Sequence, residues 1–105
     1  MPELEGTMSN RWLTTLTIDQ DKLKVTPTDI LGALESENIE ARPVWKPLHL
    51  QPLFDGVKYY SHDEGKSVSD DLFANGLCLP SGSNMTVEQQ ERVIETILKV
   101  INKSN

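Results

Sequence analysis

Residues able to do chemistry are concentrated in one short stretch, Val44–Phe54, which reads VWKPLHLQPLF. It places a cation (Lys46), an imidazole (His49) and an amide (Gln51) after Trp45, among prolines that each fix one φ angle. Fixed φ angles lower the entropy lost when a loop is ordered, so this stretch could present Lys46 and His49 for binding. Alternatively, its large apolar side chains pack the loop onto the core and Lys46 is simply solvated. The residues alone leave both interpretations open.

Other reactive side chains give weaker patterns. Cys78 is the single cysteine and lies between two leucines in GLCLP, with no cation beside it to favour a thiolate, so we interpret it as a small buried hydrophobe. The second histidine, His62, precedes two acidic residues, but this spacing matches no familiar metal-ligand pattern. The turn PSGSN has no Walker-type lysine after it. No catalytic residue, cofactor-binding residue or metal ligand is therefore predicted on this chain.

Composition excludes several classes of partner. The 105 residues are enough for about one domain. Sixteen acidic against ten basic residues give a net charge of −6, which does not suit the phosphate backbone of a nucleic acid. No run approaches the roughly 20 apolar residues of a membrane span, and MPELEGTMSN is not a signal peptide. A single cysteine fits a reducing compartment, so a cytoplasmic location is expected.

Three elements are predicted in the first half of the chain. Alternation of apolar and polar residues predicts a strand over Arg11–Asp19, with Trp12 and Ile18 on the same face. The next element is a helix that begins at the N-cap Thr26 and ends near Asn38 in a left-handed conformation. A second strand is expected over residues 39–45, at a sheet edge or broken at Pro43, which lacks a backbone donor.

The second half begins with an irregular segment, residues 46–66, which is longer than most connections and is therefore a candidate functional loop. A short helix over Ser67–Gly76 follows, then a strand over Leu77–Pro80. The last helix starts with a capping box of Thr86 and Gln89 and continues to residue 103. The predicted order is strand, helix, strand, loop, helix, strand, helix, which is an α/β (α+β) domain with three strands.

Three blocks of sequence together resemble one enzyme family. They are SNRWLT (Ser9–Thr14), ARPVWKPLHLQPLF (Ala41–Phe54) and LFANGLCLPSGSNMTVEQQERVI (Leu72–Ile94). In this order and spacing they are similar to the C-terminal region of pyridoxal phosphate (PLP)-dependent sugar aminotransferases of the DegT/DnrJ/StrS type. The combination of an R-P-x-W-x-P-x-H-x-Q-P loop, a G-L-x-L-P-S-G turn and a T-x-E-Q helix start is specific, and the blocks cover nearly the whole chain.

The resemblance implies the small C-terminal domain of a fold-type-I aminotransferase, with helices on one side of a three-stranded sheet. Such enzymes are homodimers that transfer an amino group to a nucleotide-linked keto sugar, in the biosynthesis of polysaccharides or other glycans. Residues 1–9 would be a leader or linker from a missing large domain, and residues 10–105 the small domain. An alternative is a stand-alone α/β interaction or dimerisation module without catalysis.

The family's PLP lysine lies in a Ser-x-x-Lys segment followed by Gly-Glu-Gly-Gly, and this sequence has neither. Since Schiff-base chemistry needs that lysine, the chain alone is expected to be inactive and to hold no PLP, whereas the parent enzyme would.

By the same resemblance, Lys46 and His49 are the best candidates for contacting sugar hydroxyls or phosphate in the parent enzyme. Gln51 would contact the sugar or brace the loop, and Trp45 would pack or stack. Asn10 and Arg11 begin the first strand; Arg11 would bind a substrate carboxylate or phosphate, or form an ion pair that braces the two domains.

Overall fold

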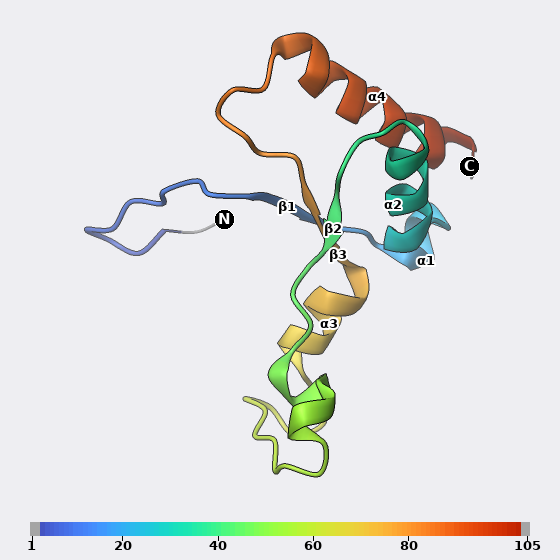
Figure 1. Ribbon diagram of the computed structural model, residues 1–105. Helices are drawn as coiled ribbons and strands as arrows, with labels where there is room; N and C mark the ends of the chain where they lie inside the picture. The colour runs from blue at the N-terminus through green and yellow to red at the C-terminus, as the bar shows by residue number, and fades with distance from the viewer. Residues whose placement is uncertain (1–2, 104–105) are drawn as a thin grey trace.

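The computed structural model describes residues 3–103, which form a three-stranded antiparallel sheet with four helices (Figure 1). The strands are β1 (Thr14–Thr17), β2 (Arg42–Pro43) and β3 (Gly76–Leu79), and their order in the sheet is β1-β3-β2. Both edge strands pair with β3, so that Leu77 lies between Leu16 on one side and Pro43 on the other. The predicted fold class and three strands are confirmed.

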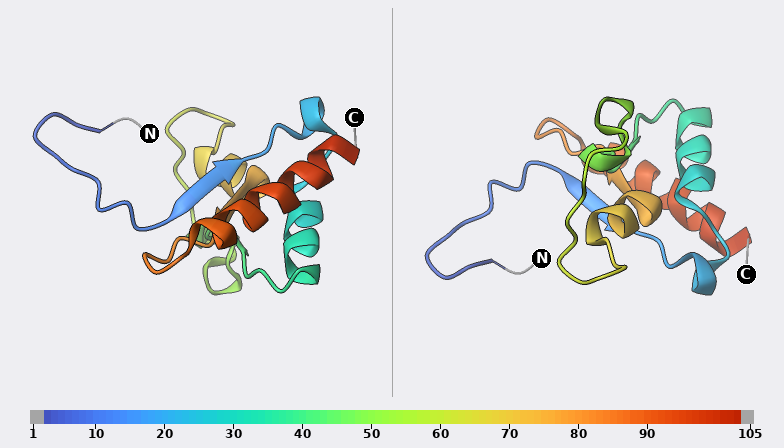
Figure 2. Two further views of the ribbon diagram at one scale, coloured as in Figure 1. Left: turned by 90° about the horizontal axis from the view of Figure 1, so that it is seen from above. Right: turned by 90° about the horizontal axis from the view of Figure 1, so that it is seen from below.

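Helices α2 (Pro27–Ser36) and α4 (Val87–Lys103) pack against each other and cover one face of the sheet. The core lies between them and that face; it consists of seven buried residues, Ile18, Val25, Ile30, Leu34, Leu77, Val93 and Ile97. Helix α3 (Val68–Asn75) leads directly into β3 and lies apart from the α2–α4 pair (Figure 2). Cys78 lies on the opposite face of the sheet, between Thr15 and Arg42.

Both long helices begin with capping boxes. At α2 the backbone N–H of Asp29 donates to Oγ1 of Thr26 (3.2 Å), and the N–H of Thr26 donates to Oδ2 of Asp29 (2.9 Å). The Thr26 hydroxyl also donates to this carboxylate, and these bonds lower the pKa of Asp29. At α4 the predicted box is confirmed: the backbone N–H of Gln89 donates to Oγ1 of Thr86 (3.2 Å), and the N–H of Thr86 donates to Oε1 of Gln89 (2.9 Å). The end of α2 also follows the prediction, with Asn38 at a φ of 56°.

The predicted strand over Arg11–Asp19 is too long. Before β1, the backbone N–H groups of Arg11 and Trp12 donate to the side chains of Ser9 and Asn10 instead of to a neighbouring strand, and Arg11 has a φ of 51°. After β1, Asp19 caps the four-residue helix α1 (Gln20–Leu23). Side chains that bond to their neighbours' backbone compete with the sheet ladder, so the strand ends early on both sides.

The second predicted strand, over residues 39–45, is also shorter, because only Arg42 and Pro43 pair with β3. Its edge position is confirmed by the strand order. Two short 3-10 turns follow, η1 (Leu48–Leu50) and η2 (Pro52–Phe54), within the segment predicted to be irregular. Gly76 ends α3 as predicted, with an extended backbone (φ −104°).

Candidate functional site

A groove of about 660 Å³ lies on the sheet face that α2 and α4 leave open, with the buried Cys78 among its lining residues. Its apolar wall includes Leu13, Trp45 and Phe73. Three kinds of polar side chain border it: the carboxylate of Glu40, the cations of Arg42 and Lys46, and the hydroxyl of Ser81. The groove therefore combines an apolar floor with a charged rim, as ligand-binding clefts commonly do.

The two cations of this groove differ in their surroundings. Nε and Nη2 of Arg42 donate to the same carboxylate oxygen of Glu40, at 2.9 and 2.6 Å, so the charge of Arg42 is already balanced. The ammonium group of Lys46 forms no ion pair among residues 3–103 and is exposed. Lys46 is thus the cation that this groove offers to an anionic ligand.

Two tryptophans stand together beside this cation. The rings of Trp12 and Trp45 are 5.5 Å apart at an interplanar angle of 33°, and 67% and 59% of these residues stay exposed. Trp45 lines the groove, so the pair extends the apolar wall outward. Each indole buries part of its surface against the other, which explains how two large exposed aromatics hold defined positions.

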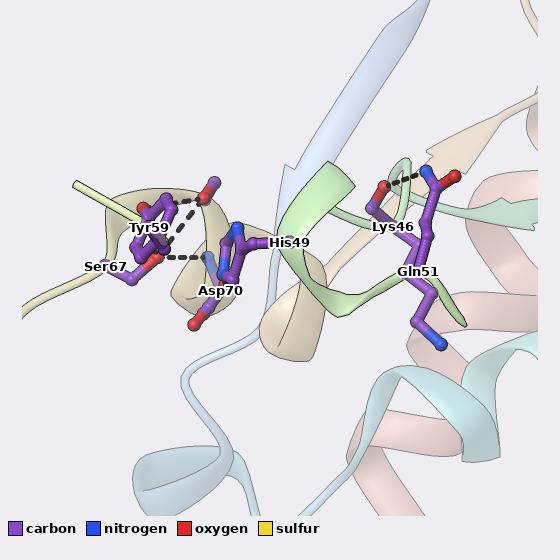
Figure 3. Close-up of polar contacts among 7 residues, drawn as sticks. Lys46, His49, Gln51, Tyr59, Ser67 and Asp70 are labelled. Carbon is purple, nitrogen blue, oxygen red and sulfur yellow. Dashed lines mark hydrogen bonds and ion pairs between the residues drawn. The ribbon is translucent and has the colours of Figure 1, made fainter. Parts of the chain in front are cut away.

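The loop after Trp45 is braced by a predicted residue. Gln51 Nε2 donates to the backbone carbonyl oxygen of Lys46 at 3.0 Å, across the turn η1 (Figure 3). This bond spans five residues and holds the backbone from which Lys46 projects. Of the two roles considered for Gln51, the geometry corresponds to the bracing one.

The imidazole of His49 points away from this bond toward α3 (Figure 3). Its Nε2 lies 2.6 Å from Oδ1 of Asp70, and its ring stacks on Tyr59 with centroids 3.7 Å apart. Only 17% of the His49 side chain is exposed. The Tyr59 hydroxyl lies 2.9 Å from Oγ of Ser67, the residue that caps α3.

The structure thus does not gather the five predicted site residues in one place. Lys46 lines the groove, whereas the other four are absent from its lining. Asn10 and Arg11 lie in the exposed N-terminal arm, where Oδ1 of Asn10 accepts from the Trp12 N–H. They are linked to the groove through Trp12, whose ring contacts that of Trp45 in a tilted arrangement.

Asp70, Tyr59 and Ser67 were not among the predicted site residues. Ser67 was assigned near a helix start, but nothing in the sequence connects Asp70 to a histidine 21 positions earlier. The available signal was indirect: the long segment 46–66 ends at a capped helix whose first turn carries two aspartates. A loop that returns to a helix N-terminus brings its polar residues near those carboxylates.

The described residues do not by themselves fit PLP. A cofactor lysine must be enclosed with the cofactor, yet all seven lysines of the chain are exposed. Likewise, within residues 3–103 no three His, Cys, Asp or Glu side chains converge in a way that could hold a metal ion. No helix in the same range is both long enough and apolar enough to cross a bilayer.

Three carboxyl groups with lowered pKa values lie at helix starts, outside the groove. Besides Asp29, the pKa of Asp19 is lowered, chiefly by the hydrogen bond from the Lys22 side chain. The pKa of Glu88 is lowered by its own backbone N–H and by the Thr86 hydroxyl. These three carboxylates are therefore structural charges that stabilise helix N-termini.

Comparison with known proteins identifies relatives along nearly the whole chain. The chain is 59% identical over 98 residues to EpsN of Bacillus subtilis (strain 168), which is provisionally named a pyridoxal phosphate-dependent aminotransferase. It is 26% identical over 100 residues to the GDP-perosamine synthase of Vibrio cholerae. These alignments cover 93% and 95% of this chain but 24% and 26% of the relatives, so the chain spans about a quarter of their length. The model of the DegT/DnrJ/EryC1/StrS aminotransferase family matches residues 1–98, and the chain belongs to that family.

Proposed function

We propose that this chain is the C-terminal small domain of a PLP-dependent aminotransferase that aminates a nucleotide-linked keto sugar. Family membership supports aminotransferase chemistry, and the relative named GDP-perosamine synthase supports a nucleotide-sugar substrate. The reaction would serve the synthesis of a polysaccharide or other glycan. PLP, when bound, supplies the chemistry that transfers the amino group, and its lysine would come from the large domain of a cytoplasmic homodimer.

The role of this chain in that enzyme is to form part of the sugar-nucleotide pocket. The observation that carries this proposal is the unpaired ammonium of Lys46 at a groove walled by Trp45. A nucleotide-linked sugar offers the complementary chemistry, with phosphates for the cation and ring faces for the aromatic wall. His49 would contact a sugar hydroxyl or phosphate, Gln51 would brace the loop, and Asn10 and Arg11 would hold the arm beside the pocket.

The experiment is to replace Lys46 by Gln in the full-length enzyme and to measure its two half-reactions separately by the cofactor absorbance. Losing one hydrogen bond to a charged partner costs about 1.5–3 kcal/mol, or roughly 10- to 150-fold in kcat/KM. We expect this loss in the amination of the keto sugar and little change in the reaction with the amino donor. The matched control is Lys99→Gln, which removes an exposed lysine from the distant helix α4.

His49→Ala is the second variant and should act in the same direction. Equal slowing of both half-reactions would contradict a pocket-wall role for either residue. Absence of any aminotransferase activity from the full-length protein would instead favour the alternative, a non-catalytic interaction or dimerisation module. For the 105-residue chain alone, treatment with PLP and borohydride should not label one specific lysine stoichiometrically, which mass spectrometry would detect.

A further inference from the structure

Two contacts constrain the imidazole ring of His49, one from a carboxylate and one from an aromatic ring. The Nε2 atom of His49 and the Oδ1 atom of Asp70 lie 2.6 Å apart, both atoms are buried, and within residues 3–103 neither makes a hydrogen bond of regular geometry, so this contact is the one polar interaction shown for either atom. The face of the ring is covered by Tyr59, at an interplanar angle of 18°. One contact constrains an edge of the ring and the other constrains its plane.

Tyr59 and Asp70, the two residues that contact the ring, are both hydrogen-bonded to the N-cap residue of α3. The hydroxyl of Tyr59 pairs with Oγ of Ser67 (2.9 Å), and that same oxygen accepts the backbone N–H of Asp70 (3.3 Å). Asp70 sits in the first turn of a capped helix, where the aligned peptide dipoles favour its negative charge. The ring is therefore tied to a helix terminus through two independent routes.

We infer that Asp70 is a positioning residue that fixes the tautomer and orientation of the His49 ring. This inference rests on the proposed role of His49 toward the nucleotide-linked sugar. A carboxylate oxygen 2.6 Å from Nε2 favours a proton on that nitrogen, so in the neutral ring Nδ1 carries the lone pair and is the hydrogen-bond acceptor. A sugar hydroxyl is the donor that suits an accepting Nδ1. Residues that orient a functional imidazole in this way act through the histidine without touching the ligand.

Nitrogen-15 NMR of the histidine rings tests the holding contact directly, since a neutral imidazole gives distinct shifts for its two tautomers. The chain has two histidines, and the exposed His62 serves as an internal reference. We expect His49 to be in the Nε2–H form in the wild-type chain at a pH where the rings are neutral, and Asp70→Ala to shift it toward the mixture seen for His62. A wild-type His49 with the same tautomer mixture as His62 would overturn the inference.

The matched control is Asp71→Ala. Asp71 lies in the same first turn of α3, but its side chain forms no ion pair within the described residues. Both substitutions remove one negative charge from the same helix start, so only the contact with His49 separates them. An equal effect of the two variants on the His49 shifts would contradict the assignment. Asp70→Leu, which has a similar side-chain shape but no acceptor for the His49 ring, replaces Asp70→Ala if the latter fails to fold.

Kinetics of the full-length enzyme give the second readout. Asp70→Ala should lower kcat/KM for the keto sugar roughly 3- to 10-fold, as expected for a lost neutral hydrogen bond, and should add nothing in a His49→Ala background. Additive losses would overturn the positioning role. The two proposals fail separately: if His49→Ala leaves sugar amination unchanged, the sugar contact is wrong, while the NMR comparison still decides whether Asp70 fixes the ring.

Discussion

Gly76 occupies the junction of three elements, and we predict that replacing it by Ala destabilises the fold. The residue joins α3 to β3, its Cα pairs with Thr17, and its carbonyl oxygen accepts the N–H of Val44. Its φ of −104° suits any amino acid, so the need for glycine is spatial and not conformational. A Cβ atom added here would collide with the backbone carbonyl oxygen of Leu72 and lie 2.7 Å from Cγ2 of Val44.

The size of the effect depends on which neighbour can move. The Val44 side chain can shift by a few tenths of an ångström, but the Leu72 carbonyl belongs to the backbone of α3 and moves only with the helix. Overpacking of this kind typically costs about 1–3 kcal/mol, and a backbone collision places Gly76→Ala in the upper half of that range. Domains of this size have about 5–15 kcal/mol of stability, so the loss should be readily measured.

Urea unfolding of the 105-residue chain, followed by circular dichroism, is the assay. Gly32→Ala is the matched control, because Gly32 lies inside α2 and an added Cβ would meet nothing within 4 Å. Alanine is the better helix former by about 0.8–1 kcal/mol, so this variant should be stabilised. Val44→Ala combined with Gly76→Ala should recover a small part of the loss. Full rescue by Val44→Ala, or a Gly76→Ala variant as stable as the wild type, would refute the argument from the Leu72 carbonyl.

Three further substitutions or conditions test the stability of the core and caps. Leu34→Ala should lower the free energy of unfolding by about 2–5 kcal/mol, because Leu34 is fully buried. The urea midpoint should fall accordingly. Thr86→Ala should cost about 1 kcal/mol in the same assay, and Thr86→Ser much less, since Ser keeps the capping oxygen. The stability that the carboxylates of Asp19, Asp29 and Glu88 contribute should be fully present above the ordinary carboxyl pKa of about 4 and be lost as the pH falls through their lowered pKa values. Asp29→Asn should reduce this loss in an acid titration of unfolding.

Elements whose signals are local could be predicted from the sequence. The capping box of Thr86 and Gln89 and the left-handed Asn38 depend on residues within one helical turn, and both appear as expected. Local competition also explains the errors. The strand over Arg11–Asp19 has the right alternation, but short polar side chains at each end bond to the backbone and shorten it to four residues.

The candidate site could be predicted only in part, because its decisive contacts join distant residues. The sequence singled out the stretch around Lys46 as a loop that could present side chains to a ligand, but the groove that Trp45 and Lys46 line depends on β3 lying beside β2. The partner of His49 lies in a helix 21 residues away, and no periodicity encodes that pairing. The tilted ring contact of Trp12 with Trp45 likewise joins the N-terminal arm to the loop after β2.

The distribution of burial separates this chain into a part that determines the fold and a part that can adapt to a ligand. No residue between Glu35 and Asn75 is buried, and the core consists of residues before and after that range. The segment that carries Lys46 and His49 is therefore held outside that core, by the Gln51 bond, the Asp70 ion pair and the ring contacts of Trp45 and His49, which together contribute less than an apolar core. Substitutions in this segment should consequently change ligand contacts while the unfolding midpoint changes little.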